Sequence, residues 1–214
     1  MQGRLSPIVD GKIQSFPKKT WQQEFLFARE LGIFLMEWTL DADDLYQNPL
    51  MKPDGRLKIN ELCNVNGILI KTLTGDCFMQ RPFWKLDAPE LKQDFFNIII
   101  SASAIGIDRI VVPLVDEGRL EDSCQRQNLV SFLLEHEDFL FAQRIQICFE
   151  SDFDPANLKD FIDEFPVRSF GINYDTGNSA SLGWDVEKEF ANYGERILNI
   201  HIKDRSIGGT TVDL

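Results

Sequence analysis

IQICFESDFDPANLKDFIDEFPVRSFGINYDTGNSASLGWDVEKEFANYGERILNIHIKDR, residues 145–205, holds three short apolar runs separated by two segments of helical character. The runs are residues 145–150, 170–175 and 197–204, and the helical segments are residues 154–165 and 185–193. Strands that alternate with helices build parallel sheets. This stretch therefore predicts consecutive β-α-β-α-β units, around which the rest of the chain is organised.

Each run carries, near its carboxyl end, one residue that can bind a metal or move a proton: Glu150, Asp175 and His201. Successive side chains of a strand point to opposite faces. In every run the reactive residue shares its face with small or polar side chains, and the other face is aliphatic or aromatic; Leu198 and Ile200 are expected on that apolar face. Parallel strands covered on both faces are usually apolar throughout. The pattern instead favours a barrel with a polar site at its carboxyl-terminal mouth.

The preceding chain continues the alternation. Further strands are predicted at residues 1–5, 33–39, 68–74 and 107–115, and further helices at 19–31, 57–65, 88–105 and 124–142. The sequence contains no GxGxxG motif, which disfavours a doubly wound nucleotide-binding sheet. We predict one α/β domain over residues 1–214, a (β/α)8 TIM barrel. The strand candidates number seven and residues 206–214 read as a loop, so we expect an incomplete barrel with its eighth strand missing and its first strand short.

Composition excludes several classes of protein. The net charge of −12 disfavours nucleic-acid binding, which depends on Lys and Arg neutralising phosphates. The four cysteines form no CxxC pair, as expected for free thiols in a reducing compartment. No leader sequence is recognisable, and no apolar run approaches the roughly 20 residues of a membrane span. We expect a soluble cytoplasmic protein with no membrane partner.

At several places the chain resembles the xylose-isomerase-like TIM-barrel family. The segments that carry the resemblance are MQGRLSP, EWTLD, TGDCFMQRPFWK, CFESDFDP, GINYDTGNSASLG and NIHIKDR. The family includes sugar-phosphate isomerases and epimerases as well as endonuclease-like members. In its epimerase branch a Glu, an Asp, a His and a final Glu bind one divalent metal, and the two Glu residues exchange protons with the sugar. The resemblance implies that Glu150, Asp175 and His201 are metal ligands and that Glu150 is catalytic.

The chain departs from the epimerase branch at two places. The fourth ligand, expected on an eighth strand, is absent from residues 1–214, and Asn178 stands where a His often follows the Asp. The predicted substrate-binding residues are Arg4, Glu37, Asn178, Lys203, Asp204 and Arg205. Structural alternatives stay open for most of these positions. Glu37 could pair with Arg4, residues 203–205 could be a solvated loop, and Asp175 could serve the turn that DTGN predicts.

Oxygen-rich sites with one imidazole suit Mn²⁺, Mg²⁺ or Co²⁺, with Zn²⁺ as an alternative. A neutral imidazole ligand predicts metal affinity that falls below about pH 6.5. We predict an enzyme, a metal-dependent isomerase or epimerase of a sugar or sugar phosphate working through an enediolate. The alternatives are a non-catalytic barrel that binds a carbohydrate-like ligand, and a Schiff-base aldolase using Lys71 or Lys203. With two histidines, the chain lacks the ligands of a zinc-cluster endonuclease. A homo-oligomer is left open.

Overall fold

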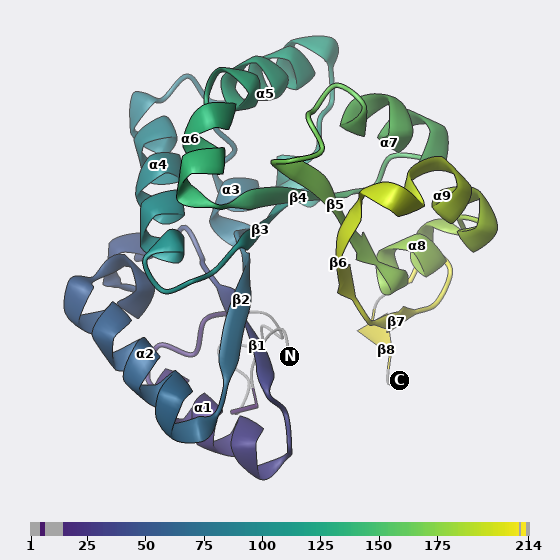
Figure 1. The fold of residues 1–214 in the computed structure, drawn as a ribbon. Helices are drawn as coiled ribbons and strands as arrows, with labels where there is room; N and C mark the ends of the chain where they lie inside the picture. The colour runs from purple at the N-terminus through teal and green to yellow at the C-terminus, as the bar shows by residue number, and fades with distance from the viewer. Residues whose placement is uncertain (1–4, 7–14, 210, 213–214) are drawn as a thin grey trace.

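The computed structural model describes residues 5–6, 15–209 and 211–212 of the 214-residue chain. Within these residues, six parallel strands form one curved sheet in which each strand pairs with the next along the chain (Figure 1). The strands are β1 (Leu35–Thr39), β2 (Leu69–Thr74), β3 (Arg109–Leu114), β4 (Gln146–Ser151), β5 (Phe170–Asp175) and β6 (Ile197–His201). The sheet is a curled half-barrel, as the incomplete TIM barrel predicted. The strand expected at residues 1–5 lies almost wholly outside the described residues.

Helices follow the strands and lie along the outside of the curve (Figure 1). The α-helices are α1 (Trp21–Glu30), α2 (Pro53–Asn66), α3 (Asp76–Gln80), α4 (Pro89–Ser103), α5 (Ser123–Glu135), α6 (Glu137–Gln143), α7 (Pro155–Ile162), α8 (Thr176–Leu182) and α9 (Val186–Tyr193). Short 3-10 turns are η1 (Leu45–Gln47), η2 (Pro49–Met51), η3 (Asp116–Gly118) and η4 (Gly194–Arg196). The antiparallel pair β7 (Asp204–Arg205) and β8 (Thr211–Val212) follows β6. No described helix is both long and apolar enough to cross a membrane.

Three sequence predictions differ from the structure. The helix expected over residues 124–142 is two helices, α5 and α6, because His136 between them leaves helical geometry with φ −110 and ψ 15. The last strand ends at His201, and residues 204–205 belong to the hairpin instead. The turn expected at DTGN is the first turn of α8, which the Asp175 carboxylate caps by accepting a hydrogen bond from the Asn178 backbone N–H. Turns and helix caps use the same side-chain chemistry, so sequence alone does not separate them.

A β-bulge also changes which residues of β6 face the barrel interior. Ile172 pairs with Ile197 but Asn173 pairs with Asn199, so Leu198 is the extra residue. A Cβ added to Gly171 would lie 2.5 Å from the Leu198 side chain, which therefore covers the small inner face of β5 instead of joining the apolar outer face. The shift flips the first residues of β6 and leaves Asn199 and His201 facing inward, in register with β5.

Aromatic packing anchors the strands that carry the candidate ligands. Phe149 on β4 is fully buried, and its ring centroid lies 5.0 Å from that of Phe161 on α7. Phe165 and Phe170 complete this cluster between the sheet and α7, with centroids 4.7 Å apart. Replacing one such ring with Ala costs about 3–5 kcal/mol of folding free energy. The outward side chains of β4 and β5 therefore fix the strands while the inward side chains are free for chemistry.

Candidate metal centre

Three reactive side chains meet at the carboxyl-terminal ends of three neighbouring strands. Glu150 lies near the end of β4, and Asp175 and His201 are the last residues of β5 and β6. One ligand atom of each lies within 4.8 Å of the others, and all three side chains are buried. In-register pairing of Asp175 with His201 contributes directly to this convergence. The inner faces of the strands thus bring together two carboxylates and an imidazole.

The His201 imidazole is held between carboxylates on both sides. Its Nε2 lies 2.8 Å from Oε1 of Glu37, and its Nδ1 lies 3.3 Å from Oε2 of Glu150 and 3.9 Å from Oδ2 of Asp175. Burial lowers the pKa of the imidazole, but hydrogen bonds and charge from Glu150 and Glu37 outweigh it and raise the pKa to about 9. A metal ion at Nδ1 must therefore displace a proton whose pKa lies well above the unperturbed value near 6.5, on which the sequence prediction was based.

Two amide side chains hold the Glu150 carboxylate. Asn173 Nδ2 donates to Oε2 at 2.7 Å, and Asn178 Nδ2 donates to Oε1 at 2.7 Å. Sequence reasoning gave Asn178 to the substrate but assigned no role to Asn173, although its inward position on β5 was readable from strand alternation. Each carboxylate oxygen keeps lone pairs after accepting one amide hydrogen. The amides therefore orient the Glu150 carboxylate and leave each oxygen with a lone pair for a metal ion.

The two carboxylate oxygens of Asp175 have different partners. Oδ1 accepts the backbone N–H of Asn178 at 2.9 Å, whereas Oδ2 is buried and accepts no amide or hydroxyl hydrogen bond from the described residues. The Lys203 ammonium lies 2.8 Å from Oδ2 and balances its charge. A divalent cation would replace this ammonium as the partner of the buried oxygen. The donor set of two carboxylates and one imidazole fits a hard divalent cation.

The residues after β6 reach the site unequally. Lys203 contacts Asp175, and Arg205 Nη1 donates to Asn178 Oδ1 at 2.7 Å, so both cations neighbour the ligand cluster. Gly177 allows this approach, because a Cβ there would lie 2.9 Å from Lys203 Cβ. Asp204 is exposed in the hairpin. Arg4, another predicted substrate-binding residue, lies outside the described residues.

Glu37 and Asp76 add buried carboxylates around the centre. Burial raises the pKa of Glu37, but contacts with His201 and Thr74 outweigh it and hold that pKa below its usual value. Asp76, at the start of α3, is 9% exposed; burial, then the charges of Asp41 and Glu150, raise its pKa to about 7. Sequence analysis assigned no role to Asp76. No local signal marks it, because its burial depends on how the strands assemble.

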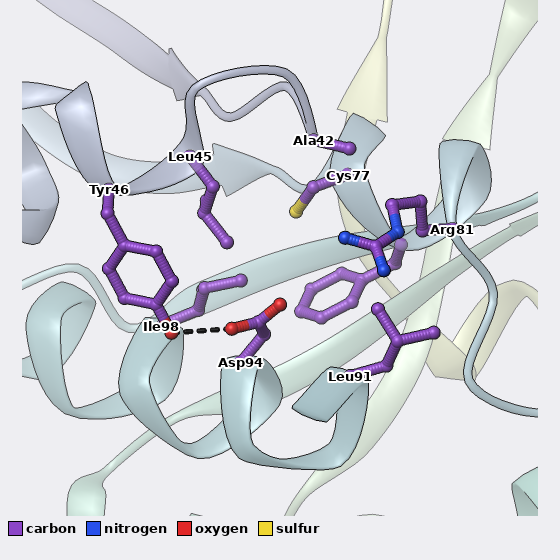
Figure 2. Close-up of a pocket in the computed structure, with 9 residues that line it drawn as sticks. Ala42, Leu45, Tyr46, Cys77, Arg81, Leu91, Asp94 and Ile98 are labelled. Carbon is purple, nitrogen blue, oxygen red and sulfur yellow. Dashed lines mark hydrogen bonds between the residues drawn. The ribbon is translucent and has the colours of Figure 1, made fainter. Parts of the chain in front are cut away.

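The candidate metal centre and a pocket near α4 are separate cavities with different lining residues. The space beside Glu150 and Asp175 has a volume of about 20 Å³, room for one small ion or water and too little for a sugar. Figure 2 shows the pocket near α4, where the Tyr46 hydroxyl donates to Asp94 at 2.5 Å and Arg81 is one of the lining residues. None of the three candidate ligands lines that pocket. The cavity beside Glu150 and Asp175 is therefore too small to enclose a sugar.

Comparison with known proteins places this geometry in a family. The family model described as xylose isomerase-like TIM barrel matches residues 25–211. No curated protein gives a significant sequence match.

Solved structures share the fold at low sequence identity. A xylose isomerase domain protein from Planctomyces limnophilus is 14% identical, with a TM-score of 0.71 over 89% of this chain and 75% of its own. A D-psicose 3-epimerase solved in the presence of D-fructose is 15% identical, with a TM-score of 0.71 over 86% of this chain and 67% of its own. An IOLI protein with a bound zinc atom is 16% identical, with a TM-score of 0.65 over 89% of this chain and 69% of its own.

Proposed function

This chain belongs to the xylose isomerase-like TIM-barrel family, and on that premise we propose that it is a metal-dependent isomerase or epimerase of a sugar or sugar phosphate. The observation that carries the proposal is the convergence of Glu150, Asp175 and His201 within 4.8 Å at the ends of neighbouring strands. The similar structures solved with D-fructose and with zinc support a sugar substrate and a metal. Residues 1–214 act as one domain in this proposal.

Glu150, Asp175 and His201 would hold the metal, with Glu150 contributing a carboxylate oxygen, Asp175 its Oδ2 and His201 its Nδ1. When bound, a divalent cation polarises the carbonyl and hydroxyl oxygens of a keto-sugar and acidifies the hydrogen between them. Glu150 would move this proton, because a carboxylate within the ligand cluster can act as a general base beside the metal. The amides of Asn173 and Asn178 keep both of its oxygens oriented.

Substrate contacts come from the side chains that border the cluster. Lys203 and Asn178 each touch a candidate ligand, and Arg205 touches Asn178. A sugar hydroxyl or phosphate above the centre meets these groups first. Lys203 pairs with Asp175 in the absence of a metal, and a divalent cation would take over that charge balance and free the ammonium for a substrate oxygen.

The test combines metal titration with hydrogen exchange into the sugar. We expect zinc, manganese or cobalt to bind with one site per chain in calorimetry, and a keto-sugar panel in D₂O to gain deuterium next to the carbonyl by NMR. Asp175→Asn and His201→Ala should abolish both signals. His136→Gln, which changes the other histidine of the chain, is the matched control and should keep both.

The possible results separate the proposal from its alternatives. Metal binding without deuterium incorporation for any sugar would favour a binding barrel without catalysis. Equal metal affinity in wild type, Asp175→Asn and His201→Ala would remove these residues from the site and overturn the proposal.

A further inference from the structure

The Glu37 carboxylate holds the side of the His201 ring that faces away from Glu150 and Asp175. Glu37 Oε1 lies 2.8 Å from Nε2, whereas the two candidate ligand carboxylates lie nearer Nδ1. Glu37 and His201 are 164 residues apart in sequence and both are buried. We propose that Glu37 is a positioning residue that keeps the imidazole proton on Nε2 and so leaves the Nδ1 lone pair for the metal. The inference rests on the proposed metal site and adds a role to it.

Glu37 can do this because an ionised carboxylate only accepts hydrogen bonds. Thr74 Oγ1 and His201 Nε2 both donate to its Oε1. Two donors on one oxygen suit an acceptor-only carboxylate at this buried position. Metal-binding histidines commonly donate their other ring N–H to a carboxylate, which fixes the tautomer and the ring orientation.

Two amide side chains, Asn199 and Asn173, link Glu37 by hydrogen bonds to the Nδ1 side of the His201 ring. Asn199 Nδ2 points at Glu37 Oε2 at 3.3 Å and also donates to Asn173 Oδ1 at 2.9 Å. Asn173 must then turn its Nδ2 toward Glu150 Oε2 at 2.7 Å and His201 Nδ1 at 3.0 Å. An amide N–H facing Nδ1 suits a ring nitrogen that carries a lone pair, and a metal ion at Nδ1 would replace this amide contact. The orientations of the Asn199 and Asn173 amides thus follow from Glu37 being an acceptor.

The two histidines of the chain give a spectroscopic test with an internal reference. His136 Nδ1 lies 2.7 Å from the Phe132 carbonyl oxygen, which only accepts, so His136 carries its proton on Nδ1. Long-range ¹H–¹⁵N spectra of the zinc-loaded protein should show the opposite tautomer for His201, with an Nε2 proton that exchanges slowly. Zinc affinity is measured alongside by competition with a chelator.

Two variants of Glu37 separate positioning from packing. Glu37→Gln keeps the shape but supplies N–H donors, and Glu37→Asp is shorter but keeps an acceptor-only group. We expect Glu37→Gln to lose the slowly exchanging Nε2 proton and to weaken zinc binding by about 10–100-fold. Glu37→Asp should retain more zinc affinity than Glu37→Gln. A role in packing alone predicts the reverse order, because Gln fills the site better. Glu30→Gln, an exposed change on α1, is the control for lost charge.

The failure of this inference differs from the failure of the proposed function. Wild-type protein that binds zinc and exchanges substrate hydrogen, with unchanged zinc affinity and His201 tautomer in Glu37→Gln, would overturn the role of Glu37 alone. Wild-type protein that binds no zinc overturns both, since Glu37 then has no ligand to position. Thermal unfolding of the metal-free variants checks that each is folded.

Discussion

The buried carboxyl of Asp76 makes metal-free protein less stable as pH rises. Its side chain has no hydrogen bond from the described residues and is 9% exposed. Burial raises its pKa from 3.8 to about 7, the nearby charges of Asp41, Glu150 and Glu37 add to the rise, and Lys203 opposes it. An acid with a raised pKa in the folded state stabilises the fold most below its unfolded pKa. That contribution is lost as pH rises from 3.8 through about 7.

Asp76→Asn removes this charge while keeping the shape. One pKa unit corresponds to about 1.4 kcal/mol, so the raised pKa of Asp76 costs the fold ~4 kcal/mol at pH 8, where the buried carboxyl is ionised, and ~2 kcal/mol at pH 5, where folding must protonate it. We therefore expect Asp76→Asn to raise the free energy of unfolding by ~2 kcal/mol more at pH 8 than at pH 5. Burying the amide also costs free energy, but that cost does not change with pH. The difference between the two pH values isolates the carboxylate.

Urea unfolding of chelator-treated wild type and variant at several pH values measures this difference. Asp160→Asn, which removes an exposed carboxylate on α7, is the control for net charge and should show a much smaller pH-dependent gain. A stabilisation by Asp76→Asn that is equal at pH 5 and pH 8 would refute the reasoning. It would mean that Asp76 is solvated or paired when ionised.

Two further predictions concern the His201 proton and the exposed edge of the sheet. Zinc affinity should rise about tenfold per pH unit from about pH 6.5 to about 9, because binding displaces the His201 proton. Calorimetry in buffers of different ionisation enthalpy counts the displaced proton. A zinc affinity that stays constant over this pH range contradicts the prediction. Ile200 and Ile202 are 51% and 72% exposed at the end of the described sheet, so the chain should self-associate through this face. Replacing both with Lys should shift size-exclusion and light-scattering mass toward the monomer, whereas Leu57→Lys, an exposed change on α2, should not; an unchanged mass distribution counts against this face.

The sequence by itself determined the order of the elements and the identity of the inward reactive residues. Strand alternation is local, so Glu150 and Asp175 could be assigned to the polar face of their strands from a few neighbours. Parallel strands joined by helices bring carboxyl ends to one edge, so the meeting of these residues with His201 at one mouth was predictable too. Helix ends were less predictable, because the Asp175 side chain serves a turn or a cap equally well.

Only the tertiary structure decided which partners these residues have. The β-bulge at Leu198 is a matter of pairing between two strands, and it reversed the predicted face of that residue. The contact between Glu37 and His201 joins positions 164 residues apart, and no local pattern indicated that the imidazole would be the partner of Glu37. The raised pKa values of Asp76 and His201 follow from burial and from charges on other strands. Register, burial and long-range charge arise only when the strands assemble, which is why the residue pattern of any single strand could not supply them.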